Sequence, residues 1–235
     1  MRRTDKPRAS TALAQRFTPE QWTEIHERLR SLPRALRSYA YWKLRLDPVY
    51  AQVLEELPLQ GEMVDLGTGI GLLPLLVALT RPSLRIRAVE WDSHKARTAR
   101  FLLRGLRHVT VEEVDARAVP IGTPTAIAML DILHYSAHSE AMRWLRACIG
   151  ALHPGGVLLI RELEPSRWAI APLLERVAVL ARWNRGGGVY PLSSSEVAEV
   201  LSSLGLKVAN RPAGSGLFRA NTLTIARRPE PLHEH

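Results

Sequence analysis

The chain of 235 residues has a single cysteine, Cys148. One cysteine excludes an intramolecular disulfide framework and is typical of a reducing compartment. No apolar run reaches the roughly 18 residues that a membrane-spanning helix needs. The arginine-dotted N-terminus also lacks the apolar stretch of a secretory signal. The sequence therefore predicts a cytoplasmic protein without a membrane span.

Lysine is also scarce, since only four of the 32 basic residues are lysines. The formal net charge of +9 and the pI near 10.4 are compatible with an anionic partner such as nucleic acid. However, arginine amid abundant alanine and leucine resembles a codon bias more than a selected phosphate-binding face. Residues 1–16 hold five basic residues against one acidic residue, so a loose tail accounts for four of the nine charges. Nucleic acid is therefore a less favoured partner than a small molecule.

The chain is organised around the stretch 63–73, which reads as a buried strand, a glycine-rich turn and an apolar helix. Gly67, Gly69 and Gly71 follow Asp65 at every second position. Only glycine allows so tight a turn together with close approach of a ligand to the backbone, so this turn predicts a docking face. A dinucleotide fingerprint, G-x-G-x-x-G, would place its third glycine one residue later.

The pattern Asp65-x-Gly67-x-Gly69-x-Gly71 resembles motif I of the class I (Rossmann-like) S-adenosylmethionine (SAM)-dependent methyltransferases. The resemblance covers residues 61 to about 228. It implies an α/β fold with a seven-stranded, mostly parallel sheet, helices on both faces and an antiparallel last strand. It also implies SAM as the cofactor and S-adenosylhomocysteine as the product.

An acidic residue ends each of the next two predicted strands. Glu90 lies about 20 residues past the glycine turn, where one carboxylate can accept hydrogen bonds from both ribose hydroxyls. The resemblance assigns the adenine amino group to Asp115 and a ring nitrogen to the backbone N–H of Ala116. Alone, Asp115 would be a helix cap or a turn residue. Trp91 is either an apolar wall for the adenine or a packing residue.

The fourth predicted strand, 126–130, leads into Asp131, His134 and Tyr135. Ligands of open parallel sheets bind beyond the strand ends where the strand order reverses, and the first and fourth strands flank that point. This segment resembles motif IV of small-molecule methyltransferases, whose matching positions line the methyl-transfer channel. A neutral imidazole is a suitable general base, so His134 is the predicted catalytic residue with Tyr135 beside it. Alternatively, both side chains only line the pocket.

The predicted site contains no metal. Its cofactor-binding residues are Asp65, Gly67, Thr68, Gly69, Gly71, Glu90, Trp91, Asp115, Ala116 and Asp131.

The predicted organisation has four parts. Residues 1–16 form a disordered basic tail, residues 17–60 a helical cap, residues 61–228 the methyltransferase domain, and residues 229–235 a C-terminal tail. Within the domain, a helical insertion at 168–190 is expected over the substrate site, as the family implies. The connection 211–222 is too short and too rich in glycine and proline for a crossover helix, so the last two strands should be antiparallel.

The helical cap should begin at Thr18, because Thr18, Pro19 and Gln21 form a helix-start pattern. Asp47 is the expected cap of the third helix. The family resemblance would place aromatic and basic side chains of this region near the cofactor pocket, or they only attach the cap to the domain. These side chains are Tyr39, Tyr41, Arg45 and Tyr50.

We expect a SAM-dependent methyltransferase that acts on an oxygen, carbon or nitrogen of a small or carrier-bound molecule. Segment 131–134 lacks the Asn/Asp-Pro-Pro-aromatic run of adenine amino-methylating enzymes, and Cys148 is badly placed for cytosine carbon methylation. A spermidine-synthase relative would need a different first motif and an acidic pocket. Two alternatives stay open: an RNA methyltransferase, and a non-catalytic binding or regulatory domain that kept the cofactor fold.

Overall fold

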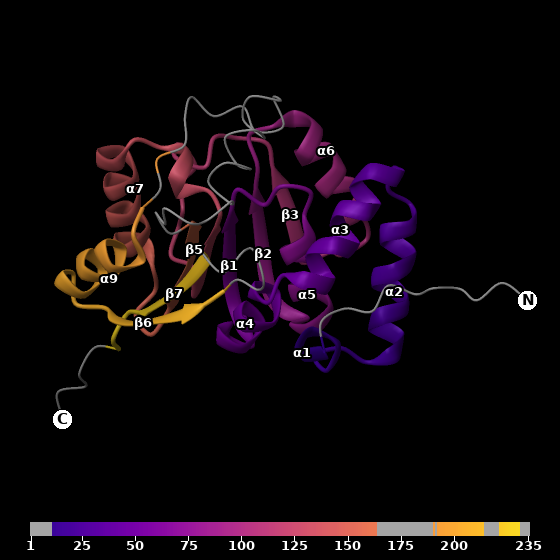
Figure 1. Cartoon of the computed structure of the whole chain (residues 1–235), viewed down its shortest axis with the longest axis horizontal. Helices are drawn as coiled ribbons and strands as arrows, with labels where there is room; N and C mark the ends of the chain where they lie inside the picture. Colours follow the sequence, from indigo (N-terminus) through magenta and orange to yellow (C-terminus); the bar gives the residue numbers. More distant parts are fainter. Residues whose placement is uncertain (1–10, 164–189, 191, 214–220, 231–235) are drawn as a thin grey trace, which may run out of the picture.

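The computed structural model describes residues 11–163, 190, 192–213 and 221–230 (Figure 1). The first ten residues of the predicted tail lie outside the described residues, as do residues 168–189 of the predicted insertion and the last five residues of the chain. The predictions for these segments therefore stay predictions.

A seven-stranded sheet forms the centre of the described part, in the order β3-β2-β1-β4-β5-β7-β6 (Figure 1). Strand β7 runs antiparallel to β5 and β6, whereas β1 to β5 are parallel to one another. The predicted fold class and the antiparallel ending are confirmed. The strands are β1 (Gln60–Leu66), β2 (Ser83–Val89), β3 (Val109–Glu112), β4 (Ala126–Leu130), β5 (Val157–Leu163), β6 (Lys207–Pro212) and β7 (Asn221–Arg227).

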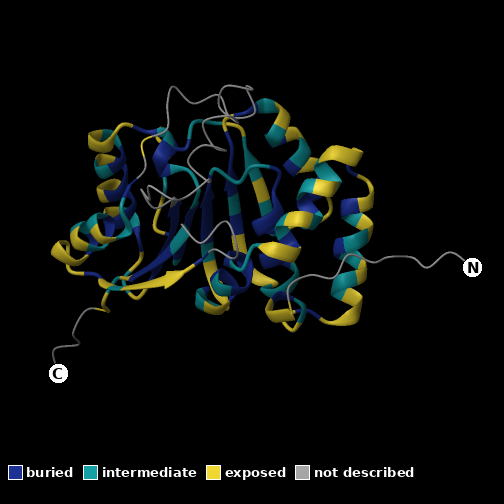
Figure 2. Ribbon diagram, in the orientation of Figure 1, coloured by how far each residue is buried: buried dark blue, intermediate teal, exposed yellow. Residues whose placement is uncertain are grey.

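Helices cover both faces of the sheet, because successive strand residues point to opposite faces and both sets are apolar. Met63 belongs to the core cluster shared with the N-terminal helices, α5 (Leu72–Thr80) and α6 (Ser93–Leu102). Its neighbour Val64 belongs to the cluster shared with η1 (Leu133–Tyr135), α7 (His138–Ala151) and α9 (Ser194–Ser203). The inner strands β1 and β4 are accordingly mostly buried between two layers of helices, whereas the edge strand β6 is largely exposed (Figure 2).

The N-terminal helices are α1 (Thr11–Ala14), α2 (Pro19–Arg30), α3 (Arg34–Leu46) and α4 (Val49–Glu56). The capping box is confirmed, since Thr18 and Gln21 each bond the other's backbone N–H at the start of α2. The expected cap at Asp47 is corrected by one residue: Pro48 caps α4, although Asp47 Oδ1 accepts the N–H of Val49 at 3.1 Å.

The prediction of a disordered tail is wrong for the part that the structure describes. Residues 11–14 form α1, and Leu13 is fully buried in the core. One apolar side chain in a polar segment is too weak a periodic signal to predict a helix, but its burial attaches the segment to the domain.

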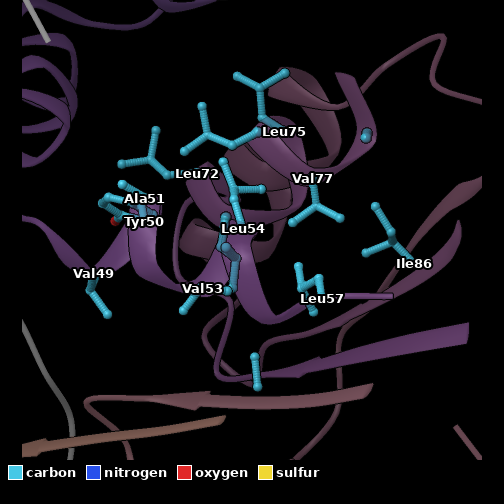
Figure 3. Packing of buried hydrophobic residues seen from close by; sticks show 14 of the residues in the cluster. Val49, Tyr50, Ala51, Val53, Leu54, Leu57, Leu72, Leu75, Val77 and Ile86 are labelled. Atoms are coloured by element: carbon cyan, nitrogen blue, oxygen red, sulfur yellow. The ribbon is translucent and has the colours of Figure 1, made fainter. Parts of the chain in front are cut away.

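Helix α4 packs against α5 next to the glycine turn (Figure 3). Val53, Leu54, Leu75 and Val77 are each no more than 1 % exposed at this contact. Burying one such side chain contributes about 1.5–3 kcal/mol, so the contact fixes the N-terminal helices on the sheet. Within the described residues, no helix has the length and apolar character needed to cross a membrane.

The strand order reverses between β1 and β4, which pair in parallel with Leu66 opposite Met129. The connection after β1 leads outward to α5 on one side, and the connection after β4 leads to η1 and α7 on the other. The carboxyl ends of these two strands therefore border a crevice of the kind that binds ligands in open α/β sheets.

Candidate active site

The glycine turn is a strand-to-helix connection with a left-handed backbone at all three glycines. Gly67, Gly69 and Gly71 have φ angles of 78°, 60° and 85°. The N–H groups of Gly67 and Thr68 both donate to the carbonyl of Val89, at 2.9 and 3.0 Å, so the turn is fixed to the end of β2. Side chains other than glycine rarely adopt such φ angles, which explains why the turn consists of glycines.

Each glycine is required for a different reason. A Cβ on Gly67 would lie 2.2 Å from Cδ1 of Ile132, and a Cβ on Gly71 would lie 3.1 Å from Cβ of Ala99. These two glycines therefore allow close packing of η1 and α6. A Cβ on Gly69 would meet no atom within 4 Å. The predicted docking face is thus limited to the middle of the turn, because Ile132 covers its first glycine.

Glu90 lies beside this open face. Its Oε2 accepts the N–H of Gly69 at 2.8 Å, and its Oε1 accepts the N–H of Asp92 at 3.0 Å. Burial raises the pKa of Glu90, while these two backbone N–H groups favour the charged form. Each carboxylate oxygen can accept a second bond. The position at the end of β2 fits the predicted ribose ligand, and Glu90 also holds the turn, a role that the sequence did not predict.

Two buried polar atoms at the turn make no hydrogen bond of ordinary geometry to the described residues, although the Thr68 side chain is close enough to Asp65 to favour its charged form. They are Oδ2 of Asp65 and Oγ1 of Thr68. Asp65 is 2 % exposed, and burial raises its pKa to about 7. A buried polar atom without a bond is unfavourable, so this pair fits the donor groups of a bound ligand. The open face at Gly69 and the carboxylate of Glu90 complete a set that fits SAM.

The predicted adenine-binding residues differ in their exposure and in their partners. Trp91 is 47 % exposed and follows Glu90 directly, as an adenine wall would, whereas Ala116 is buried in the core. Asp115 is held by Arg117, whose Nε and Nη2 donate to it at 3.0 and 2.6 Å. The Arg117 side chain lowers the pKa of Asp115. Asp115 is thus a charged surface acceptor that Arg117 already occupies.

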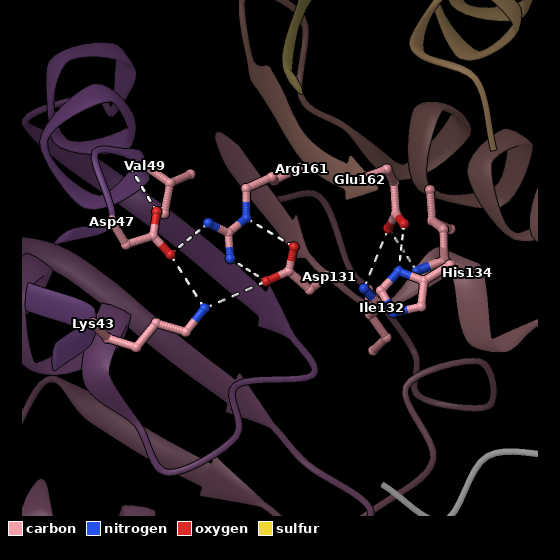
Figure 4. A network of polar contacts seen from close by, with 9 residues as sticks. Lys43, Asp47, Val49, Asp131, Ile132, His134, Arg161 and Glu162 are labelled. Carbon is pink, nitrogen blue, oxygen red and sulfur yellow. Dashed lines mark hydrogen bonds and ion pairs between the residues drawn. The ribbon is translucent and has the colours of Figure 1, made fainter. Parts of the chain in front are cut away.

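His134 is 1 % exposed, and its Nδ1 lies 2.7 Å from Oε2 of Glu162 (Figure 4). The other oxygen, Oε1, accepts the N–H groups of Ile132 and Leu133 at 3.2 and 2.8 Å. Glu162 therefore holds both the imidazole and the backbone of η1. Since Ile132 packs on Gly67, the His–Glu pair is joined to the glycine turn by a single packed residue.

The ring of Tyr135 contacts the His134 ring, with centroids 4.2 Å apart and planes tilted by 54°. The backbone N–H of Tyr190 donates to the carbonyl of His134 at 2.7 Å. Residue 190 ends the predicted insertion, so this described end of it returns to the candidate active site.

The carboxylate of Asp131 is held by two cationic side chains. Its carboxylate accepts two bonds from Arg161, with Nε to Oδ1 at 2.8 Å, and lies 3.7 Å from Nζ of Lys43 (Figure 4). Burial opposes its charge, but the cations Arg161 and Lys43 outweigh burial and lower the pKa of Asp131. Asp131 therefore belongs to a network of charged side chains, and its prediction as a cofactor ligand stays a prediction.

Sequence reasoning missed Arg161, Glu162 and Lys43 as site residues. The available signal was the place of Arg161 and Glu162 at the carboxyl end of β5, the same edge that carries the other site residues. Of the N-terminal side chains predicted near the pocket, Tyr50 is buried and Tyr39 is partly buried, and both lie close enough to the Asp131 network to interact with its charges.

Two other predicted side chains of the cap lie elsewhere. Tyr41 contacts the ring of His26 at 5.7 Å, and Arg45 is exposed.

Cys148 is fully buried, and burial raises the pKa of its thiol to about 12. A thiolate nucleophile is excluded there at neutral pH, which agrees with its interpretation as a core residue.

Comparisons with known proteins agree with this geometry. No protein-family model matches the chain. Ribosomal RNA small subunit methyltransferase G of Xanthomonas campestris pv. campestris (strain B100) is 35 % identical over 136 residues, which are 56 % of this chain and 58 % of that relative. The chain thus matches less than two thirds of the relative's length.

Among solved structures, an O-methyltransferase family protein from Burkholderia thailandensis has a TM-score of 0.63 at 21 % identity, covering 93 % of this chain and 72 % of that one. Mitomycin 7-O-methyltransferase has a TM-score of 0.62 at 26 % identity, covering 95 % and 64 %. These matches show that the chain has the Rossmann-like fold of these methyltransferases, with the seven-stranded sheet described above, and that 136 of its residues are similar to a ribosomal RNA methyltransferase.

Proposed function

We propose that the protein transfers a methyl group from SAM to an oxygen, nitrogen or carbon of a small or carrier-bound acceptor. The observation that carries this proposal is the buried His134–Glu162 pair beside the glycine turn, at the switch point of the sheet. We assign the amino-acid end of SAM to Asp65, Thr68 and Gly69, and the ribose to Glu90. The single buried thiol fits a reaction in the reducing cytoplasm.

Bound SAM supplies an electrophilic methyl group on a sulfonium. Such a transfer is an in-line displacement, so the protein has to orient the acceptor and exclude water. The bare backbone at Gly69 allows close approach on one side, and the buried η1 segment borders the other. The chain therefore contributes mainly position and a dry environment.

His134 is the residue that we assign to proton removal from the acceptor. Because the Glu162 carboxylate also accepts two backbone N–H groups, it is an acceptor toward Nδ1 as well, and the Nδ1–H tautomer follows. Nε2 is then the basic nitrogen of the ring. A hydroxyl acceptor benefits most from such a base, in agreement with the O-methyltransferases among the solved structures.

RNA is a second candidate acceptor, favoured by the ribosomal RNA methyltransferases among the relatives. One segment of the chain also favours it: residues 93–111 contain five lysines and arginines and no acidic residue. Trp91 and Phe101, 47 % and 43 % exposed, lie beside and in this segment. Cations interleaved with exposed aromatic rings are typical of surfaces that bind single-stranded RNA.

Methyl transfer can be tested with SAM that carries tritium in its methyl group. The purified protein would be incubated with small-molecule and RNA fractions of a cell extract, with and without nuclease. We expect label in the small-molecule fraction. Nuclease-sensitive label would instead support the RNA acceptor.

The matched pair of variants is His134→Gln and His138→Gln. Both histidines pair with a glutamate, but His138 is exposed on α7, with Nε2 2.5 Å from Glu196. We expect His134→Gln to lower transfer about 100-fold or more and His138→Gln to leave it unchanged. Binding of S-adenosylhomocysteine without label in any fraction would favour the non-catalytic alternative.

A further inference from the structure

Two successive residues of β5 hold the segment after β4 from opposite faces of the sheet. The Arg161 side chain lies on the face of the N-terminal helices, where it contacts Asp131 and Asp47. The Glu162 side chain lies on the face of η1, where it accepts from Ile132, Leu133 and His134. Figure 4 shows both groups on either side of the strand. Each residue of the segment 131–134 is therefore hydrogen-bonded to Arg161 or Glu162.

Arg161 bonds a residue, Asp131, whose backbone conformation is unusual. Asp131 has a φ of 58° and is the one residue other than glycine with a positive φ in the described part of the chain. Its N–H donates to the carbonyl of Arg161 at 2.9 Å, and its carboxylate receives two guanidinium bonds. A left-handed aspartate persists where its surroundings hold it, and such positions concentrate at functional sites.

The same guanidinium reaches the N-terminal helices. Nη1 of Arg161 donates to Oδ2 of Asp47 at 2.6 Å, and Lys43 lies 3.2 Å from Asp47 and 3.7 Å from Asp131. The side chains of Arg161 and Asp47 are 3 % and 10 % exposed. Two cations and two carboxylates are thus balanced at the junction of α3 and α4 with β4 and β5.

We propose that Arg161 and Asp131 are positioning residues for His134, and that their ion pair transmits the position of the N-terminal helices to the catalytic segment. This inference rests on the proposed function, since it gives His134 a role in methyl transfer. The left-handed turn at Asp131 directs Ile132 onto Gly67 and delivers His134 to Glu162. Loss of the pair releases the imidazole from Glu162 without removing either residue of the His–Glu pair.

The test reads the imidazole directly, so it needs neither an acceptor nor activity. In 15N-labelled protein, the ring nitrogens of His134 are assigned by their loss in His134→Gln, and their shifts report the tautomer. Asp131→Asn keeps a residue that tolerates a left-handed backbone but removes the charge. Arg87→Gln is the control, because Arg87 also bonds a carboxylate in two places, with Nε 2.8 Å from Glu112, but lies on β2.

We expect wild type to show one defined set of His134 ring signals with Nδ1 protonated, and Asp131→Asn to show mixed or exchange-broadened His134 signals. Arg87→Gln should show the wild-type signals. The carboxamide in Asp131→Asn can still accept from Arg161, so Arg161→Gln is the stronger second variant, and Arg161→Lys should restore part of the wild-type pattern.

Unchanged His134 signals in folded Asp131→Asn and Arg161→Gln would overturn the inference. Equal perturbation by Arg87→Gln would also overturn it, because the effect would then be general destabilisation. If Arg161→Gln does not fold, Arg161→Lys replaces it, and unchanged His134 signals in both Arg161→Lys and Asp131→Asn would overturn the inference. If wild type transfers no methyl group but shows the expected His134 signals, the proposed function is contradicted. The effect of the variants on the His134 signals still tests the positioning role.

Discussion

The two sides of the switch point differ in how their buried polar groups are satisfied. On the β1 side, buried oxygens of Asp65 and Thr68 make no hydrogen bond of ordinary geometry to the described residues, and the face of Gly69 is open. On the β4–β5 side, Asp131, Arg161 and Glu162 are bonded several times over. The β1 side is therefore built to be completed by a ligand, and the β4–β5 side is built to hold a catalytic segment in place.

The largest effect should come from breaking the buried charge network. Arg161→Leu removes a buried cation and leaves Asp47 and the partly exposed Asp131 with Lys43 as their remaining close cation, so we expect a loss of about 3–5 kcal/mol in the free energy of unfolding. Urea denaturation measures it. The control Arg117→Leu removes the half-exposed pair with Asp115 and should cost less than about 1 kcal/mol. Similar losses in both variants would erase the distinction between the two sites.

Removing the charge of Asp65 should stabilise the protein, whereas removing the charge of Arg161 should destabilise it, because the surroundings of Asp65 disfavour its charged form. Burial raises its pKa from 3.8 to about 7, so the native state holds the proton more tightly than the unfolded chain. This group's contribution is therefore complete below pH 3.8 and falls as the pH rises toward 7.

We accordingly expect Asp65→Asn to match wild type near pH 4 and to exceed its stability at pH 8 by up to about 4 kcal/mol. Urea denaturation across this pH range measures the difference. Asp115 has a lowered pKa, so Asp115→Asn should be less stable than wild type at pH 8. A wild type whose stability exceeds that of Asp65→Asn at pH 8 would show that Asp65 is satisfied within the protein.

Trp91 tests the predicted adenine end of the site. Trp91→Ala should weaken binding of S-adenosylhomocysteine by about 1–3 kcal/mol, the usual contribution of a stacked base. Trp42→Ala is the control, since Trp42 is similarly exposed, 41 % against 47 %, but lies on α3. Calorimetry gives both affinities, and equal affinities would make Trp91 a surface residue without a ligand role.

The smallest expected effect on stability comes from alanine substitutions at Gly69, the open glycine of the turn, and at Gly105, which serves as its control. Gly69 and Gly105 both have a positive φ, and a Cβ at either position would meet nothing within 4 Å. Alanine at either position should cost about 1 kcal/mol of stability for the left-handed backbone. Thermal denaturation measures this cost, and a much larger loss for Gly69→Ala would mean that the turn is a structural element first.

The sequence was sufficient for the fold because strand periodicity, the glycine spacing and the short 211–222 connection all act locally. It also predicted the edge at which Asp65, Glu90 and His134 meet, since carboxyl ends of parallel strands share one edge. It could not predict that Arg161 would pair with Asp131 and Asp47, because these contacts span 30 and 114 residues of chain. Such distant pairing depends on packing rather than on spacing.

The sequence also could not predict which side chains pair with one another. Arg117 bonds Asp115 from only two residues away, and nothing in the sequence predicts this salt bridge. The assignment of Asp115 to the adenine stays a prediction. Leu13 shows the same limit for helices, since α1 is attached by the burial of Leu13 and by a hydrogen bond from Trp22 to the carbonyl of Ala14, and neither contact is a periodic pattern.

The central claim is that the face at Gly69 binds the cofactor, and calorimetric titration with S-adenosylhomocysteine tests it most directly. Wild type and Gly105→Ala should bind one molecule per chain with equal affinity, and Gly69→Ala should bind at least tenfold more weakly. Absence of binding to wild type, or equal affinities for Gly69→Ala and Gly105→Ala, would contradict the account.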